Sequence, residues 1–434
     1  MTATPRDADD QPGAAASYPG APPKGEGGAL AEPALDRHRL RGFIAINAGA
    51  SVAFTAMYAT QPVLPQIGHD FAVGPAEAGL TLLSVTFALA FASLSAGRLA
   101  DHFGSRRVML VCSATLTILC YLVAAAPAFW LLVALRAAQG LVVPGITVAG
   151  LAFLHNELPA RQRGRVSGFY IATNTLGGLL GRLGVGLLVQ SIGWRGGLLL
   201  VAFAATLGTV VLVVGMPRRS AGDVRRAAAT RPAPVRQVAG RLWWAPLIGG
   251  TVFFPFLTVF TYTPYRLESA PFSLPASRAS LFYLVYLLGA VAAPLAGQLS
   301  DRIGRRPAIL GGLALTAVGL LISVPNILPL ALLALAFVCV GSLSSHVVAN
   351  AAVSDRANAL GPQARATALS LYTLGFYLGG GLGSYVPGYG WERFGWIGVV
   401  VPCGVAVAGA ALVAFRTSAH ARIQTPIPSP LDVP

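Results

Sequence analysis

Long apolar runs separated by short polar connections fill the chain from residue 43 to residue 415. A helix needs about 20 apolar residues to cross the hydrocarbon core of a bilayer, and most of the runs have that length. The pattern predicts an all-α integral membrane protein with twelve transmembrane helices. The predicted spans are residues 43–63, 78–96, 108–126, 129–151, 166–188, 195–214, 245–264, 279–297, 308–324, 328–351, 366–388 and 394–415.

One charged connection occurs twice. Residues 97–107 read Gly-Arg-Leu-Ala-Asp-His-Phe-Gly-Ser-Arg-Arg, and residues 297–306 read Gly-Gln-Leu-Ser-Asp-Arg-Ile-Gly-Arg-Arg. Other matches, such as Tyr170 with Tyr372, recur at an offset of 202 residues. A parallel repeat of helical halves is typical of one large class of secondary transporters, so the pattern predicts two pseudo-symmetric six-helix bundles.

The repeat and the composition together predict five segments. The long connection in the middle of the chain carries seven arginines with proline and alanine, and it is expected to be a solvated linker, with contact to anionic lipid headgroups as the alternative. The first residues are rich in proline, alanine and glycine, which is typical of disorder. The segments are a disordered tail (1–41), a first bundle (42–214), a linker (215–244), a second bundle (245–415) and a tail (416–434).

The positive charge indicates an orientation. With both termini placed in the cytoplasm, the inner connections and tails hold 25 of the 31 lysines and arginines, and the outer connections hold four. This bias follows the positive-inside rule and predicts a multi-pass protein of the cell inner membrane with cytoplasmic termini. The net charge of +15 is spread over short loops, which argues against nucleic acid as a partner. No cleavable signal peptide is expected, because residues 1–41 contain no apolar core.

Other classes of protein are disfavoured by missing motifs. Lys24 is the only lysine, so the chain has no phosphate-binding loop ending in lysine, and no histidine is followed by glutamate as in a zinc protease. The four cysteines lie inside apolar runs, without the spacing of a metal site. The sequence therefore predicts no enzyme activity, no metal and no cofactor.

Three ionisable side chains other than tyrosine and cysteine lie within the predicted spans: Arg136, Arg182 and His346. No aspartate or glutamate lies there, so the arginines are satisfied either by backbone carbonyls and water or by an anionic substrate. Both are about 10 Å from the outer ends of their helices. Snorkelling to the headgroups is the alternative for Arg182. His346 is a candidate proton carrier, with a hydrogen-bonded packing role as the alternative.

Polar and aromatic residues in or next to the predicted spans are candidates for a cavity lining, with interfacial anchoring of the aromatic residues as the alternative. They are Tyr58, Gln61, Asn174, Tyr262, Tyr265, Tyr283 and Tyr286. Two small-residue faces are expected to let helices 5 and 8, and helices 11 and 2, approach closely. These faces consist of Gly177, Gly178, Gly181, Gly379, Gly380 and Gly383.

The repeated connection resembles motif A of the major facilitator superfamily, Gly-x-Leu-x-Asp-Arg-x-Gly-Arg-Arg. The second copy fits closely, whereas the first has His102 and Ser105 at positions that are often basic. Leu135 to Gly140 resembles motif B of proton-coupled members, which implies a part in proton coupling for Arg136 and Gln139. The motif A residues are Gly97, Asp101, Gly104, Arg106 and Arg107, and Gly297, Asp301, Gly304, Arg305 and Arg306.

A finer resemblance is to the YnfM-like branch of bacterial permeases, near the drug:proton antiporters. It is carried by residues 58–65, by Tyr262 to Leu267 and by Ser345-His346. It is also carried by residues 177–182, where Leu179 and Arg182 replace the proline and the last glycine of the antiporter signature. The superfamily fold implied for residues 40–415 has two six-helix bundles.

The resemblance also implies a gate. In the superfamily, the motif A turn of one half faces the cytoplasmic start of a helix in the other half, where the partial positive charge of the helix favours a carboxylate. Asp101 and Asp301 are thus expected to stabilise the outward-open state and to lose these contacts when the cytoplasmic side opens.

The expected function is secondary active transport powered by the proton gradient, by alternating access around a central cavity. Proton-coupled efflux of a small organic solute is the first choice. Uptake of an organic anion and a transport-inactive sensor are the alternatives. The expected partners are the solute, protons and the lipid bilayer, and the protein is expected to be a monomer.

Overall fold

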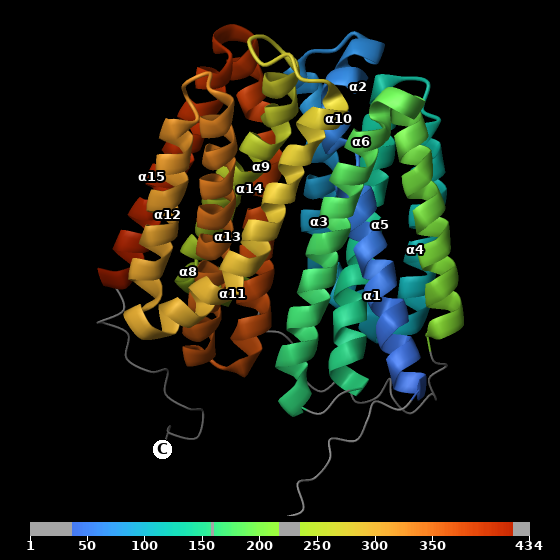
Figure 1. Ribbon diagram of the computed structural model, residues 1–434. Helices are drawn as coiled ribbons and strands as arrows, with labels where there is room; N and C mark the ends of the chain where they lie inside the picture. The colour runs from blue at the N-terminus through green and yellow to red at the C-terminus, as the bar shows by residue number, and fades with distance from the viewer. Residues whose placement is uncertain (1–36, 158–159, 217–234, 420–434) are drawn as a thin grey trace, which may run out of the picture. The chain divides into compact units, whose positions relative to one another are not determined.

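The computed structural model describes residues 37–157, 160–216 and 235–419, and these are helices joined by short turns, without a β-strand (Figure 1). The first half contains α1 (Arg37–Tyr58), η1 (Gln61–Val63), α2 (Leu64–Phe71), α3 (Pro75–Phe103), α4 (Ser105–Ala124), α5 (Phe129–Glu157) and α6 (Ala160–Gly215). The second half contains α8 (Val235–Arg241), α9 (Trp244–Glu268), α10 (Ala276–Ala279), η3 (Ser280–Val285), α11 (Tyr286–Ile303), α12 (Arg305–Ile322), α13 (Leu328–Ala359), α14 (Pro362–Phe394) and α15 (Trp396–Ala419).

The prediction of an all-helical membrane protein is confirmed. Ten helices among the described residues are long and apolar enough to cross a membrane. One of them, α6, contains two predicted spans, because the chain turns at Gly193 with φ of 70°, a conformation that glycine adopts without a steric cost. The glycine-rich α14 is the remaining predicted span, and it is as long as its neighbours.

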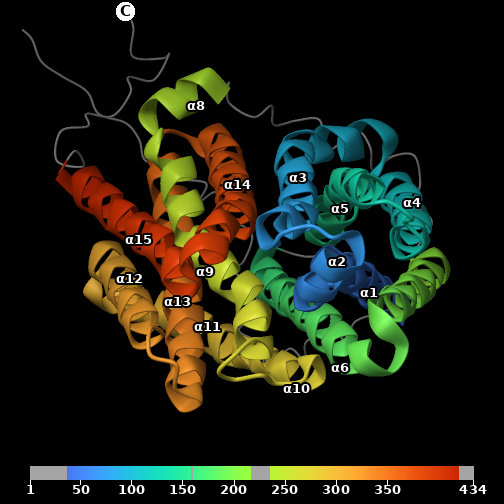
Figure 2. The ribbon, with the colours of Figure 1, turned by 90° about the horizontal axis from the view of Figure 1, so that it is seen from above.

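The same helix pairs pack together in both halves, as expected for a duplicated chain. In the first half α1 packs against α6 and α3 against α5, and in the second half α9 packs against α14 and α11 against α13. Figure 2 shows the two groups of helices, α1 to α6 and α8 to α15, which we call the first and second bundles. Between the bundles, α3 packs against α14.

The glycine faces pack against different partners from those predicted. A Cβ atom at Gly177 or Gly181 would overlap backbone oxygens of α1, and one at Gly379 would overlap backbone atoms of α9. Gly178, Gly380 and Gly383 also face the first long helix of their own bundle. The expected helix pairs do meet, since α14 packs against α3 and α6 contacts η3 and α11, and a Cβ at Gly381 would overlap Thr86 of α3. These six glycines, however, face α1 or α9 of their own bundle.

At each of these close helix contacts, one in each bundle, a threonine hydroxyl donates to the carbonyl of a glycine. Thr55 Oγ1 of α1 donates to Gly177 O at 2.8 Å, and Thr258 Oγ1 of α9 donates to Gly383 O at 2.9 Å. Glycine lets the two backbones come near enough for a threonine of one helix to reach a carbonyl of the next. These faces therefore hold each bundle together.

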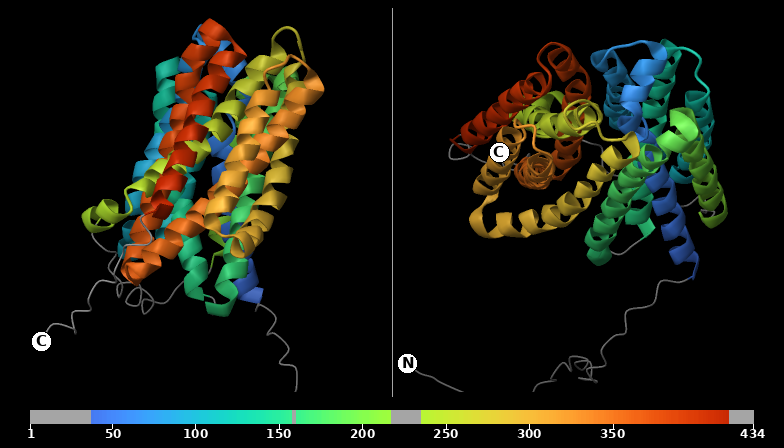
Figure 3. Two further views of the ribbon diagram at one scale, coloured as in Figure 1. Left: turned by 90° about the vertical axis from the view of Figure 1, so that its left-hand side faces the viewer. Right: turned by 45° about the horizontal axis from the view of Figure 1, so that its top comes forward.

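Helices also occupy parts of the predicted tails and of the predicted linker. Residues 37–41 of the predicted first tail belong to α1, and residues 416–419 belong to α15. Within the predicted linker, α8 is helical, buries Val238 and lies beside α14 (Figure 3). The rest of that linker, 217–234, and the tails 1–36 and 420–434 lie outside the described residues.

Candidate functional site

Arg136 lies on α5, is only 1% exposed and has a complete set of partners. Its guanidinium donates to Thr81 O at 3.1 Å, to Ala56 O at 2.8 Å, to Met57 O and to Gln139 Oε1 at 2.6 Å. The carbonyls of Ala56 and Met57 belong to the last turn of α1, where a helix lacks its own donors and carries partial negative charge. Arg136 therefore caps α1 and joins it to α3 and α5.

Arg182 lies on α6 and has no exposed surface, yet its hydrogen bonds are incomplete. Nε donates to Gln61 Oε1 at 2.5 Å and Nη1 donates to Gly178 O at 2.9 Å, whereas Nη2 is buried without a hydrogen-bond partner. The guanidinium lies 3.7 Å from the centre of the Tyr58 ring and 4.8 Å from that of Tyr286. A side chain enclosed in this way does not reach the headgroups, so the snorkelling alternative is wrong.

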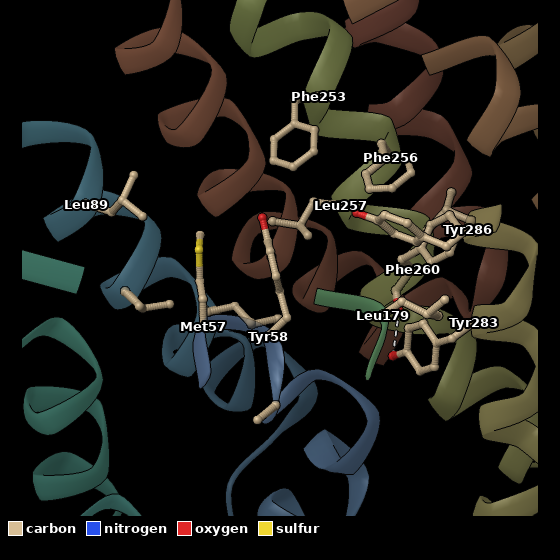
Figure 4. Packing of buried hydrophobic residues seen from close by; sticks show 14 of the residues in the cluster. Met57, Tyr58, Leu89, Leu179, Phe253, Phe256, Leu257, Phe260, Tyr283 and Tyr286 are labelled. Atoms are coloured by element: carbon tan, nitrogen blue, oxygen red, sulfur yellow. Dashed lines mark hydrogen bonds between the residues drawn. The ribbon is translucent and has the colours of Figure 1, made fainter. Parts of the chain in front are cut away.

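The surroundings of Arg182 come from both bundles. Gln61, which accepts from Arg182, donates to Thr261 Oγ1 of α9 at 2.9 Å. Tyr58 comes from α1 and Tyr286 from α11, and Figure 4 shows both beside the buried aromatic residues of α9. We call Arg182, Tyr58, Gln61, Thr261 and Tyr286 the Arg182 site.

Aromatic residues of the second bundle pack along one side of the Arg182 site. Phe260 lies 5.5 Å from Tyr286 and 4.6 Å from Phe256, between ring centres. Tyr283 is fully buried and donates to Phe260 O at 3.3 Å. Of the predicted cavity residues, the structure thus brings Tyr58, Tyr283 and Tyr286 to one place (Figure 4), together with Gln61, which binds Arg182.

The other predicted cavity residues lie elsewhere. Tyr262 donates to Ser384 O of α14 at 2.8 Å and stacks on Tyr265 with ring centres 6.0 Å apart. Asn174 of α6 is 7% exposed, and its Oδ1 has no hydrogen-bond partner. Tyr262 therefore packs α9 against α14 inside the second bundle.

His346 lies on α13 and is partly buried inside the second bundle. Its Nδ1 lies 2.9 Å from Tyr372 Oη, and this hydroxyl also lies 3.1 Å from the carbonyl oxygen of His346. Its ring centre is 4.3 Å from that of Phe376. No contact among the described residues links His346 to Arg182, so the structure places the two candidates in separate surroundings.

The two motif A turns lie at the same end of the helices, which we call the Asp-turn face, and we call the other end the opposite face (Figure 1). Gly104 and Gly304 have φ of 85° and 93°, and glycine is favoured there because it has no Cβ atom. Asp101 is exposed, and no hydrogen bond or ion pair joins it to another described residue. The predicted contact between Asp101 and the start of a helix in the other half is therefore not formed in this conformation.

The remaining motif A residues make contacts within their own bundles. Arg305 binds Asp301 at 2.8 Å and Asp355, near the end of α13, at 3.1 Å. Arg306 lies 4.4 Å from the ring centre of Phe415 on α15, and Arg106 Nε lies 3.5 Å from Met216 O after α6. A Cβ at Gly97 would meet open space, and one at Gly297 would meet only Val347. Arg107 is the exception, because it forms no hydrogen bond or ion pair with another residue of the described ranges.

The bundles are joined near the opposite face. Gln66 Nε2 of α2 donates to Glu268 Oε2 at the end of α9 at 2.9 Å, and the backbone N–H of Ala76 donates to Glu392 Oε1 near the end of α14 at 3.3 Å. Ser384 Oγ donates to Gly79 O at 3.2 Å. Every hydrogen bond found between the bundles in the described ranges lies at the opposite face or at the Arg182 site, so this conformation is closed at the opposite face.

Glu268 and Glu392 lie in predicted outer connections and are not among the residues that the sequence predicts for the site. The repeat could have indicated one pair, because Gln66 and Glu268 are separated by 202 residues and thus occupy equivalent positions in the two halves. Glu392 gave no such signal, because its partner is a backbone N–H group.

Replacement of Glu392 by glutamine is expected to shift the protein away from the conformation closed at the opposite face. Glu392 places a carboxylate at the N-terminus of α3, where a negative charge is worth about 0.3–1 kcal/mol, so the equilibrium should move about two- to fivefold. The distance between spin labels on His69→Cys and Leu281→Cys, in a chain without its native cysteines, measures the populations.

Glu77→Gln is the matched control, because Glu77 lies in the first turn of the same helix and is exposed. Its removal takes away a similar charge, and in the described ranges no hydrogen bond or ion pair joins Glu77 to the second bundle. An equal shift in both variants would show that Glu392 does not act as a latch.

The fold and the contacts between the two bundles define a class of protein. A duplicated chain with two helical bundles, a buried polar site where they meet, and contacts between them near one face has the architecture of a membrane transporter with two repeats. The model of the Major Facilitator Superfamily matches residues 46–283 and 270–430. The chain belongs to this superfamily and is a multi-pass membrane transporter rather than an enzyme.

Relatives and solved structures agree with this assignment. The uncharacterized MFS-type transporter YybF of Bacillus subtilis strain 168 is 27% identical over 350 residues, which are 80% of this chain and 86% of YybF. The inner membrane transport protein YnfM of Escherichia coli K12 is 28% identical over 368 residues, 83% of this chain and 86% of YnfM. A bacterial homologue of the human lysosomal transporter Spinster, inward-facing and occupied, has the same fold, with a TM-score of 0.71, 16% identity, and coverage of 91% of this chain and 99% of the homologue.

Proposed function

We propose that this transporter exports a small organic solute across the cell inner membrane in exchange for protons. The Asp-turn face and both termini are cytoplasmic in this proposal, because the arginines are concentrated on that side. The proton gradient is the energy source, no cofactor takes part, and a monomer is sufficient. The resemblance to permeases near the drug:proton antiporters supports export.

The observation that carries the proposal is the position of the Arg182 site. Its side chains come from α1, η1 and α6 in the first bundle and from α9 and α11 in the second. A solute bound there contacts both bundles, so movement of one bundle against the other changes the side from which the solute is reached. Contacts close the opposite face in this conformation, while Asp101 is exposed at the Asp-turn face.

His346 is the proposed carrier of the coupling proton. It is the one histidine within the predicted spans, it is partly buried, and its imidazole lies within hydrogen-bond distance of Tyr372. Imidazole binds and releases a proton near neutral pH more readily than any other unperturbed side chain. The proposed cycle needs one such group, because no carboxylate lies within the predicted spans.

Inverted membrane vesicles with an acidic lumen test the proposal. Export by proton exchange predicts that an added solute accumulates in the lumen and dissipates the pH gradient, which a fluorescent amine reports. His346→Gln is expected to abolish the dissipation and to retain exchange of solute for solute. Arg278→Gln, a change of an exposed side chain on α10, is the control.

The alternatives give different results in the same vesicles. An importer of an organic anion would release preloaded solute from the acidic lumen together with protons. A transport-inactive sensor would bind solute and move neither solute nor protons. Normal proton-driven flux in His346→Gln would refute the role of this histidine.

A further inference from the structure

We infer that the Arg182 site binds the carboxylate of an aromatic organic acid, through Nη2 of Arg182. The inference rests on the proposed function, since it names the class of solute that the transporter would carry. It starts from one atom: Nη2 is the buried group of this guanidinium that has no hydrogen-bond partner.

The positive charge of Arg182 is also not balanced by a neighbouring carboxylate in the described ranges. No carboxylate forms an ion pair with it in the parts of the chain that the structure describes, and its two hydrogen bonds go to the neutral oxygens of Gln61 and Gly178. A buried cation is costly unless an anion or a full set of acceptors surrounds it. An anionic ligand at Nη2 would supply both a charge and an acceptor.

Arg136 provides an internal comparison. It is equally buried, and each nitrogen of its guanidinium has an oxygen partner within the protein. The fold thus satisfies one buried arginine completely and leaves Nη2 of the other unpaired. A structural arginine of the same kind as Arg136 would not need an outside acceptor.

A carboxylate is a strong acceptor for a guanidinium, because the hydrogen bonds between the two groups are charge-assisted. Nε and Nη1 are already engaged, so Nη2 provides the remaining N–H groups. A single carboxylate therefore supplies the acceptor that Nη2 lacks.

The walls of the site favour an aromatic body on that carboxylate. Tyr58 and Tyr286 flank the guanidinium, and Tyr286 lies 5.3 Å from Phe256 and 5.5 Å from Phe260, between ring centres (Figure 4). Aromatic pairs at such distances add stabilisation beyond the burial of their area. Tyr58 belongs to the first bundle, whereas the other three rings belong to the second. Separation of the two bundles at the depth of Arg182 would therefore open the site.

Binding of defined probes to the full-length protein tests the inference. Benzoate and 2-naphthoate are expected to raise the melting temperature, since a ligand that binds only the native state stabilises it by mass action. The neutral isosteres benzamide and 2-naphthamide are expected to have no effect. Arg182→Gln should weaken titrated binding of 2-naphthoate by about 10- to 100-fold, the value of a hydrogen bond to a charged group.

Further variants separate loss of the ligand contact from loss of the fold. Tyr286→Leu keeps the arginine and should weaken 2-naphthoate more than acetate. Arg278→Gln changes an exposed arginine outside the site and should bind as the parent does. Equal binding of 2-naphthoate by the parent and Arg182→Gln, or equal binding of acid and amide, would overturn the inference.

The outcomes separate this inference from the proposed function. Proton-driven flux of a lipophilic cation, without binding of aromatic acids, overturns the inference and leaves the transporter proposal standing. Arg182-dependent binding of 2-naphthoate without any flux in the vesicles supports the site and overturns the proposal of transport.

Discussion

Replacement of Arg136 by glutamine is expected to lower the melting temperature of the purified protein by at least about 3 °C. The change removes the donors to the carbonyls of Ala56, Met57 and Thr81. A buried acceptor without a donor costs about 1–3 kcal/mol, so the loss of several should cost about 3 kcal/mol or more. Arg136→Lys should recover only part of the loss, because one ammonium does not span three carbonyls.

Differential scanning fluorimetry in detergent measures the change, with Arg278→Gln as the arginine control. A change of the same kind at Arg182 should have a smaller effect on stability, because Arg182 has fewer partners in the protein. A parent-like melting temperature for Arg136→Gln would show that these contacts do not hold α1 in place.

Replacement of Gly79 by valine is expected to reduce transport by about 10- to 100-fold while the protein still folds. A Cβ at Gly79 of α3 would overlap the backbone oxygen of Ser384 on α14 and lie 3.3 Å from Tyr385 Cα. Backbone atoms in packed helices have little freedom to move aside. The contact is between the bundles, so the clash should prevent closure of the opposite face and spare each bundle.

Spin labels on His69→Cys and Leu281→Cys should report an opposite face held open in Gly79→Val. Gly404→Val is the matched control, because Gly404 of α15 is exposed and a Cβ there would meet open space. Transport and label distances equal to those of the parent would show that the close approach of α3 to α14 is not part of the cycle.

The two arginines show where sequence reasoning stops. Both lie at nearly the same predicted depth, and no acidic residue lies in any predicted span, so the sequence left carbonyls and an anionic substrate as alternatives for both. The choice depends on where α1 ends relative to α5 and α6. The end of α1 supplies carbonyls to Arg136 and an aromatic ring to Arg182.

The glycine faces and the gates show the same limit. The spacing of Gly177, Gly181, Gly379 and Gly383 identifies faces for close packing, but a face does not name its partner helix. Both faces contact the first long helix of their own bundle, while the contact between the bundles uses Gly79 and Gly388. Glu392 gave no signal, because its partner is the backbone of a helix that lies 316 residues away.

The sequence by itself determined the helical membrane class, the number and approximate limits of the spans and the duplication. These properties follow from the length of the apolar runs and the repetition of residues along the chain, which do not require the folded arrangement. The tertiary structure alone decided which arginine is satisfied, which helices the glycines join and which face is closed. Those properties depend on distances between groups far apart in the sequence, and only the packing of the helices sets such distances.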